Sequence, residues 1–244
     1  MSGHRIVGRI PVLECLRAGR RRPRRLYVLR DGRGLDDLLA EAGAVPVEMR
    51  SRAELDQLVP DTPHQGVVLE AEPPRLWDAS DWLRGEIGPE ALVVALDEVE
   101  DPHNFGAIVR SAAACGAAAV VFGKRRSAPL SAAAYKAAAG AMEWIDLIQA
   151  GNLRQTLDLF RGSGFWAAAL DAEAPDLLWD ADLGGRTVLV VGNEGRGVRR
   201  LVSESCDFRL RIPLTGPITS LNASVSAAIA IAEWARKRHL RGGG

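Results

Sequence analysis

Three blocks of polar and glycine residues follow apolar, strand-like runs in this chain, and their side chains could bind and position a small polar ligand. The first block covers residues 193–197 and the second covers residues 101–112. The third combines residues 212–214 with residues 220–224. In open α/β sheets, ligands bind where the strands end. The sequence therefore predicts one ligand site built from these three blocks.

The glycines of the first block predict a tight loop whose backbone can contact a flat adenine or its ribose. Gly192, Gly195 and Gly197 do not form the G-x-G-x-x-G pattern, and no P-loop lysine follows them, which disfavours a dinucleotide or a nucleoside triphosphate. Glu194 sits within this loop. Its carboxylate could orient an arginine, or it could cap a helix expected over residues 198–203.

The second block carries an amide and a guanidinium on one expected helix. Asn104 could cap a helix over residues 105–115 and orient a sugar hydroxyl. Arg110 is a poor general base at neutral pH, because an arginine keeps its proton. It could instead bind a phosphate and stabilise a developing alkoxide, or form an ordinary ion pair with a carboxylate such as Glu194.

Apolar strands alternate with helical patterns from Ala91 onward, which predicts an α/β fold with a parallel sheet covered on both faces. Threaded chains are very rare, so these patterns alone predict an unknotted, doubly wound sheet. Strands are expected at residues 91–96, 118–122, 145–149, 165–170, 187–191 and 208–212, and helices near residues 105–115, 131–139, 153–161, 198–203 and 223–239.

A small α/β domain is expected before this sheet. Helices are predicted around residues 12–16, at 35–42 and from Ser51, where Glu54 completes a capping-box pattern, and strands at 25–29, 45–49 and 65–71. Pro73 and Pro74 mark a boundary. We therefore expect one domain over residues 1–72, a linker or peripheral helix over 73–90, and a second domain over 91–244.

The three blocks, in this order and spacing, resemble the signature motifs of the SpoU-type RNA ribose 2′-O-methyltransferases, a branch of the SPOUT class. The resemblance covers about residues 91–234. The pattern from Ile6-Val7-Gly8 to His64-Gln65-Gly66 is similar to the L30e-like substrate-binding domain of such proteins. The resemblance implies methyl transfer from S-adenosylmethionine to an RNA ribose 2′-hydroxyl. A guanosine of 23S ribosomal RNA is the expected substrate, with transfer RNA as the alternative.

The resemblance also implies site residues, a carboxy-terminal trefoil knot and a homodimer. Ser220 and Asn222 could equally cap a helix over residues 223–239. Ala139 stands where the family often has a serine, which leaves only backbone contact there. The implied catalytic residues are Asn104, Arg110, Glu194, Ser220 and Asn222. The implied cofactor contacts are Gly140, Gly192, Asn193, Glu194, Gly195, Ile212, Leu214, Ser220, Leu221 and Asn222.

Charge is unevenly distributed along a chain whose net charge is zero. Residues 1–34 hold ten arginines and two acidic side chains, a net charge of +8 that the remainder balances. Such an end is expected to meet a polyanion. Arginine on a short loop favours phosphate contact, although a solvated loop is the alternative reading. The predicted RNA-binding residues are Arg20, Arg21, Arg22, Arg24 and Arg25.

The remaining composition predicts a cytoplasmic protein without a metal or a membrane span. No apolar run approaches the roughly 20 residues of a membrane helix, and the first residues lack a signal-peptide core. Three distant cysteines, Cys15, Cys115 and Cys206, and four scattered histidines argue against disulfides and a metal site.

Two functions from other classes compete with the methyltransferase interpretation. A non-catalytic, RNA-binding ribosome-assembly factor could keep the same fold, but it would not need Asn104, Arg110, Glu194, Ser220 and Asn222 together. A dinucleotide-dependent enzyme would need the glycine fingerprint and a ribose-binding acid after the first strand. Both are missing from the sequence.

Overall fold

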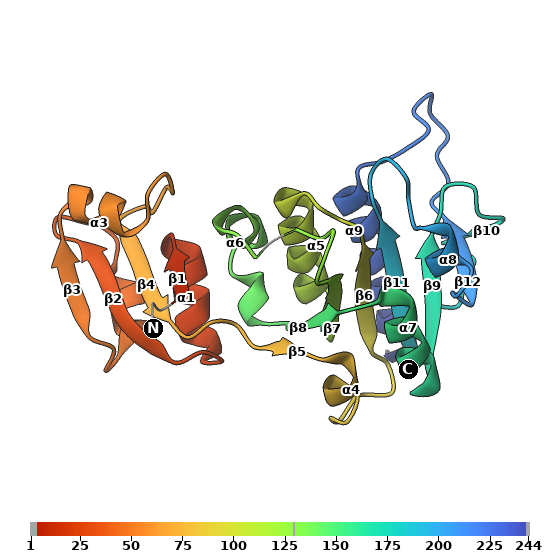
Figure 1. Ribbon diagram of the computed structural model, residues 1–244, viewed down its shortest axis with the longest axis horizontal. Helices are drawn as coiled ribbons and strands as arrows, with labels where there is room; N and C mark the ends of the chain where they lie inside the picture. Colours follow the sequence, from red (N-terminus) through yellow and green to blue (C-terminus); the bar gives the residue numbers. More distant parts are fainter. Residues whose placement is uncertain (1–3, 129, 243–244) are drawn as a thin grey trace.

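The computed structural model describes residues 4–128 and 130–242, and it contains two sheets (Figure 1). Each sheet has its own apolar core. The amino-terminal sheet has the strand order β1-β4-β2-β3, in which β2 and β3 are parallel and the other pairs antiparallel. Its elements are β1 (His4–Val7), α1 (Arg9–Ala18), β2 (Pro23–Leu29), α2 (Asp36–Ala42), β3 (Val47–Arg50), α3 (Arg52–Leu58) and β4 (Val67–Ala71).

Helices cover both faces of this small sheet. α1 and α2 pack on one face, around Val12, Leu26 and Leu38, and α3 packs on the other, where Leu55 meets Tyr27. The predicted capping box is confirmed: the Ser51 hydroxyl accepts from the Glu54 backbone, and the Glu54 carboxylate accepts from the Ser51 N–H at 2.8 Å. β1 had not been predicted as a strand.

The second sheet has eight strands in the order β10-β12-β9-β11-β6-β7-β8-β5, and every recorded pairing is parallel, as predicted. Its elements are β5 (Leu76–Trp77), α4 (Ala79–Trp82), β6 (Leu92–Asp97), α5 (Pro102–Ala114), β7 (Ala119–Gly123), α6 (Ala132–Ala138), the 3₁₀ helix η1 (Ala141–Glu143), β8 (Asp146–Ala150), α7 (Leu153–Gly162), β9 (Phe165–Leu170), β10 (Asp176–Leu177), β11 (Arg186–Gly192), α8 (Arg200–Ser203), β12 (Phe208–Arg211) and α9 (Ala223–Gly242).

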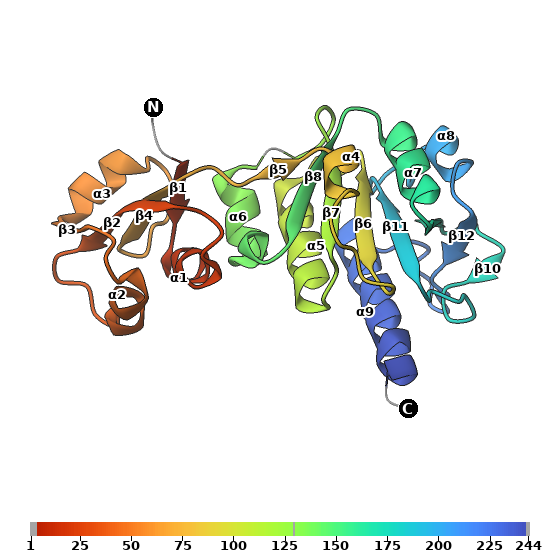
Figure 2. The same ribbon diagram turned by 90° about the horizontal axis from the view of Figure 1, so that it is seen from below.

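Two helical layers enclose this sheet, as Figure 2 shows. α5, α6 and α9 cover one face, where Phe105, Ile108 and Trp234 are buried against the strands. α4, α7 and α8 cover the other face, where Trp82 and Phe160 pack together with ring centroids 5.8 Å apart. The strands are buried on both sides, which explains their nearly continuous apolar sequences.

The segment expected to be a linker contributes an edge strand to the large sheet. β5 pairs with β8 through Leu76 and Trp77. The short helix α4 then places Trp82 in the core, and its Nε1 donates to Asp146 at 2.8 Å. Residues 76–82 are therefore integrated into the second sheet. Nothing in their two-residue strand pattern predicted this.

A buried charge cluster joins the two sheets, and it corrects one prediction. Arg21 was expected on an exposed loop, but its guanidinium lies 2.5 Å from Glu143 Oε1 and 3.0 Å from the Tyr135 hydroxyl. Both charged side chains are only 3% exposed. The His4 ring also packs on Tyr135. Arg21 therefore has no free surface for a phosphate, because Tyr135 on α6 and Glu143 on η1, far along the chain, enclose it.

Further contacts extend this junction. Arg20 forms an ion pair with Asp146, and the Trp144 indole donates to Glu14 at 2.8 Å. Burial raises the pKa of the Cys15 thiol to about 12, with Glu143 adding to the effect. This cysteine is therefore an unreactive thiol at neutral pH, because the thiolate is the nucleophilic form.

Two absences hold within residues 4–128 and 130–242. No helix there is long and apolar enough to cross a membrane. No group of three or more histidine, cysteine and acidic side chains there could hold a metal ion. Met1–Gly3, part of the terminus used in the signal-peptide argument, lie outside the described residues.

Candidate active site

The predicted blocks lie at the carboxyl edge of the parallel sheet, where residues of the first and third blocks line a cavity of about 1210 Å³. The second block does not line it and reaches it only through the contact of Asn104 with Glu194. β6 and β11 are neighbours, with Asp97 opposite Gly192, so the loops that follow them start side by side. Eight of the residues predicted to contact a cofactor line this cavity. They are Gly192, Asn193, Glu194, Gly195, Ile212, Leu214, Ser220 and Leu221.

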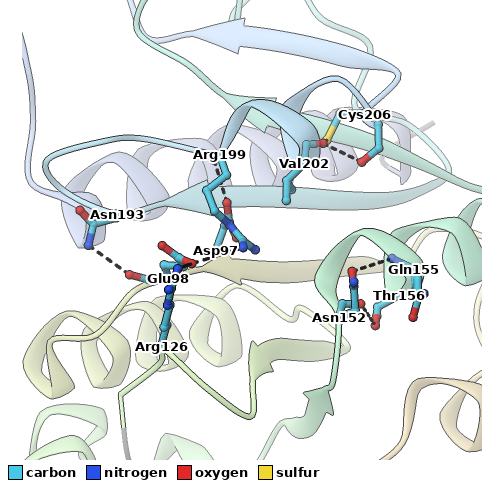
Figure 3. Close-up of polar contacts among 11 residues, drawn as sticks. Asp97, Glu98, Arg126, Asn152, Gln155, Thr156, Asn193, Arg199, Val202 and Cys206 are labelled. Atoms are coloured by element: carbon cyan, nitrogen blue, oxygen red, sulfur yellow. Dashed lines mark hydrogen bonds and ion pairs between the residues drawn. The ribbon is translucent and has the colours of Figure 1, made fainter.

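The loop after β11 doubles back on itself, and only glycine fits where it turns. A Cβ atom at Gly192 would lie 2.0 Å from the carbonyl carbon of Gly197. The Asn193 and Gly197 backbones exchange two hydrogen bonds, at 3.1 and 2.8 Å. The Asn193 side chain accepts from the Gly195 N–H at 2.9 Å and donates to the Glu98 carbonyl at 3.1 Å (Figure 3). Backbone groups therefore form this wall of the cavity.

Asn104 and Glu194 meet at the rim of the cavity, where the Asn104 amide donates a hydrogen bond to the Glu194 carboxylate. Two predicted roles are therefore corrected. Asn104 does not cap its helix, because α5 starts at Pro102 and the Asp101 side chain accepts from the His103 N–H. Proline suits the first helical position, since its missing N–H is not needed there. Glu194 caps no helix either, since Arg199 precedes α8 without a side-chain cap.

Arg110 is exposed and points away from this rim. Six residues of α-helix separate it from Asn104, about 9 Å along the axis and about 240° around it. It does not line the cavity, and no ion pair of Arg110 is recorded within the described chain. The expected pair between Arg110 and Glu194 is therefore not formed. Gly106 sits between them, where a Cβ would lie 2.4 Å from the Ala134 carbonyl oxygen, so α5 and α6 pack closely.

The third block combines a helix cap with cavity-lining residues. The Asn222 side-chain oxygen accepts from the backbone N–H groups of Ser224, at 2.8 Å, and Val225, at 3.4 Å. Asn222 therefore caps α9, one of the two roles open from sequence, and it does not line the cavity. Ser220 and Leu221 do line it.

Gly140 lies elsewhere, at the junction of the two sheets. A Cβ atom there would meet the Glu14 side chain at 2.5 Å, and its φ of +86° is left-handed. The contact with α1 and the tight turn into η1 explain this glycine. The predicted cofactor contact at Gly140 is not part of the cavity described above.

The remaining arginines of the basic run lie on the surface. Arg24 and Arg25 pair with Glu72 at 3.8 Å and Glu48 at 2.5 Å, and all four side chains are at least partly exposed. Arg22 is exposed, and no ion pair of it is recorded in the described part of the chain. Exposed pairs contribute little and can be exchanged for a phosphate. Arg22, Arg24 and Arg25 are thus available to RNA.

Sequence reasoning missed a polar cluster directly behind the loop after β11. Asp97 is buried at the end of β6, and its carboxylate accepts from the Arg199 backbone N–H at 2.8 Å, from Nε at 2.9 Å and from a terminal nitrogen at 2.6 Å (Figure 3). These hydrogen bonds raise the pKa of Arg199 further above its usual value. The sequence signal that could have found this cluster was Asp97, a charged residue at the end of the otherwise apolar strand β6.

Comparison with known proteins matches both parts of the chain. Residues 91–232 match the SpoU rRNA Methylase family, and residues 5–77 match a family described as RNA 2′-O ribose methyltransferase substrate binding. The chain is 42% identical to the 23S rRNA (guanosine-2′-O-)-methyltransferase RlmB of Pseudomonas aeruginosa, over 82% of this chain and 81% of that one. The protein belongs to the SpoU rRNA methylase family.

Two solved structures share the fold. A crystal structure of an RNA 2′-O ribose methyltransferase aligns with a TM-score of 0.80 at 28% identity, covering 96% of this chain and 88% of that one. The SpoU methyltransferase AviRb from Streptomyces viridochromogenes, solved with AdoMet, aligns with a TM-score of 0.81 at 22% identity, covering 98% of this chain and 91% of that one.

Proposed function

We propose that this protein transfers a methyl group from S-adenosylmethionine to the ribose 2′-hydroxyl of a guanosine in 23S ribosomal RNA. The observation that carries the proposal is the cavity at the carboxyl edge of the sheet, which is lined by eight of the residues predicted to contact the cofactor. The relationship to RlmB supports the guanosine of 23S rRNA as the substrate. The cytoplasm, where ribosomal RNA and this cofactor meet, is the proposed location.

The cavity suits an adenosine-containing cofactor. Its volume is sufficient, and the Gly192–Gly197 wall offers backbone donors and acceptors without side chains in the way. Ile212, Leu214 and Leu221 add apolar surface suited to an adenine ring. Bound there, S-adenosylmethionine supplies an electrophilic methyl group. We assign Gly192, Asn193, Gly195 and these three apolar residues to cofactor contact.

The chain's own polar residues would orient the ribose. The Asn104 amide is held by Glu194 at the rim, and its carbonyl oxygen can accept from a sugar hydroxyl. Ser220 lines the cavity and offers a hydroxyl, and Asn222 fixes the start of α9 close to it in the chain. Such positioning can supply several kcal/mol of the barrier reduction. Arg110 would bind the target phosphate and stabilise charge on the attacking oxygen.

We propose a homodimer, because the exposed Arg110 side chain does not line the cavity of its own chain. A second copy packed against this side would receive Arg110 at its own cavity. Apolar surface near the cavity is exposed for such packing: Ile218 is 68% exposed and Val225 on α9 is 46% exposed. We therefore propose that each active site combines the cavity of one protomer with Arg110 of its partner.

Light scattering should give twice the 26.2 kDa mass of one chain at micromolar concentration. Val225→Asp should shift the mass toward one chain, because it places a charge in the proposed interface. The matched control is Leu159→Asp on α7, an apolar residue of similar exposure, 46%, on the opposite face of the sheet. A single-chain mass for the wild type would contradict the proposed dimer.

The amino-terminal sheet is proposed to be the L30e-like, RNA-binding part, and its family match supports this role. The division between the two domains, expected over residues 73–90, is now proposed to lie at residues 72–75, because β5 and α4 belong to the second sheet and its core. We also propose that the segment between β12 and α9 passes through a loop of the second domain to form a trefoil knot. Residues 212–221 share the cavity with the loop after β11, which is compatible with that threading.

The salt dependence of RNA binding should report the surface arginines. Replacing Arg22, Arg24 and Arg25 with glutamine should reduce the slope of log affinity against log salt by about two, because each lost phosphate contact removes about 0.7–0.9. S-adenosylmethionine affinity should not change. Filter binding with a 23S rRNA transcript measures the slope. Glutamine at Arg84, Arg154 and Arg161, exposed arginines around α4 and α7, is the control, and equal slopes in both triple variants would contradict the assignment.

Two measurements test the proposed function. Calorimetry should show binding of S-adenosylmethionine and not of NAD. Ribose-methylation mapping of ribosomal and transfer RNA, with and without the gene, should show loss of one guanosine methylation in 23S rRNA. A lost methylation in transfer RNA would move the substrate to that class. Unchanged methylation of both RNAs would instead favour a non-catalytic assembly factor.

A further inference from the structure

The loop that forms one wall of the cavity has little apolar anchoring of its own. Residues 194–197 are exposed, and Gly195 and Gly197 give this stretch wide conformational freedom. A loop of this kind must be ordered before it can present its backbone groups to a ligand, and ordering during binding reduces affinity. What holds the loop in place therefore bears directly on the cavity.

The loop is tied at both ends to the carboxyl end of β6, through its last residue Asp97 and the following residue Glu98. At its start, the Asn193 amide donates to the Glu98 carbonyl at 3.1 Å. Glu98 has a left-handed φ of +58°, which turns the chain here. This backbone conformation costs free energy for residues other than glycine. At its end, Arg199 gives three hydrogen bonds to Asp97, whose side chain is 0% exposed. Figure 3 shows both tethers on one side of the sheet edge.

The Asp97 tether is the stronger of the two. All three of its hydrogen bonds involve a carboxylate, and such bonds contribute more than neutral ones. Arg199 also lies 3.2 Å from the Glu98 carboxylate, which pairs in turn with Arg126 at 3.2 Å. Neither Asp97 nor Arg199 lines the cavity. Their effect on a ligand would therefore be transmitted through the loop.

We propose that Asp97 and Arg199 are positioning residues that hold the loop after β11 in its cofactor-binding shape. The inference rests on the proposed function, since it assigns the pair to S-adenosylmethionine affinity. The Arg199 backbone N–H fixes the end of the loop, and the guanidinium fixes the direction in which the chain enters α8. Loss of either partner frees the loop, with Glu194 in it, when no cofactor is bound. Asn104 on α5 and Ser220 lie outside the loop, and Glu194 returns to Asn104 when bound cofactor orders the loop.

The test compares Asp97→Asn, Arg199→Gln and the double variant. Each single change should raise the dissociation constant for S-adenosylmethionine at least tenfold, measured by calorimetry without RNA. The double variant should be no weaker than Asp97→Asn, because the two changes remove the same tether. At saturating cofactor, the turnover number on ribosomal RNA should stay within threefold of the wild type. Arg199→Lys should recover only part of the affinity, since it keeps the charge without the planar fork.

Glu233→Gln on α9 is the matched control, because Glu233 is also nearly buried and bonded by an arginine, at 2.8 Å, but its partners Arg236 and Lys237 lie on its own helix and not on the loop after β11. Its melting temperature should fall about as far as that of Arg199→Gln, with unchanged cofactor affinity. Should Asp97→Asn fail to fold, Arg199→Gln, whose side chain is 46% exposed, decides the question.

Three results would overturn the assignment. Cofactor affinity within twofold of the wild type would leave the pair a purely structural role. A lower turnover number with unchanged affinity would place its action on the chemistry. If the increases in the dissociation constant of the two single variants multiply in the double variant, Asp97 and Arg199 contribute to affinity separately. A wild type that does not bind S-adenosylmethionine would overturn the proposed function as well, so the two failures are distinguishable.

Discussion

Replacing Arg110 with alanine should abolish methyl transfer, with a fall of at least about 10²–10³-fold, the usual effect of removing one donor that stabilises a developing oxyanion. Affinity for S-adenosylmethionine should stay within a few-fold, because the residues that line the cavity do not include Arg110. Single-turnover methylation of ribosomal RNA measures the first quantity and calorimetry the second. Arg154→Ala, an exposed arginine on α7 across the sheet, should retain full activity.

Mixed dimers would show which cavity Arg110 serves. Arg110→Ala and Asn104→Ala homodimers should each be inactive. If Arg110 acts on the partner's cavity, a mixed dimer has one intact site, because the Arg110→Ala chain keeps Asn104 and receives Arg110 from the other chain. The purified mixed dimer should then have about half of the wild-type activity, on the two-site arrangement proposed above. If activity is not restored, Arg110 acts within its own chain. A second explanation, that Arg110→Ala is inactive because it binds S-adenosylmethionine poorly, is checked by the calorimetry above.

The largest expected effect on stability comes from Arg21. Arg21→Met should leave Glu143 buried without its counterion, and breaking a buried pair in this way costs about 3–5 kcal/mol. For a chain of this size, the melting temperature should fall by roughly 6–20 °C. Adding Glu143→Leu should recover most of the loss, because an apolar pair of similar volume avoids the unpaired charge. Circular dichroism measures both.

The loss should also depend on pH. Burial raises the pKa of Glu143, while Arg21 opposes that rise. Without Arg21, a carboxyl group with a raised folded-state pKa gives stability that is present at low pH and lost as the pH rises through that pKa. The Arg21→Met variant should therefore be closer to the wild type near about pH 5 than near about pH 8. A deficit that does not change with pH would mean that Glu143 is solvated in the variant.

Local patterns predicted helices and strands well where the hydrophobic period agreed with the residues that end each element. β9 was expected at residues 165–170 and is Phe165–Leu170, because an apolar run is bounded there by glycine and a polar loop. The two-residue strands β5 and β10 carry no periodic signal and could not be predicted. α5 starts three residues before the expected helix, since Asp101 and Pro102 form its beginning although they read as loop residues.

Site residues could be predicted from the sequence where they follow the end of one strand. They could not be predicted where a residue contacts another that lies far along the chain. The loop after β11 was found because its glycines are contiguous. Arg21 was assigned to RNA because its partner Glu143 lies 122 residues away. Gly140 was placed with the cofactor, but its neighbour is Glu14 on α1, in the amino-terminal part of the chain. Such pairings follow from tertiary packing, which no local pattern records.

The junction between the sheets has a consequence for synthesis on the ribosome. Arg21 is made 122 residues before Glu143, a delay of about 6–24 s at usual elongation rates. During that interval the amino-terminal sheet can already fold around Val12, Leu26 and Val28. The Arg21 guanidinium, which Glu143 does not yet enclose, remains hydrated. The dehydration of Arg21 is thus deferred until the later half of the polypeptide arrives, and the order of translation separates folding of the first module from its attachment to the second.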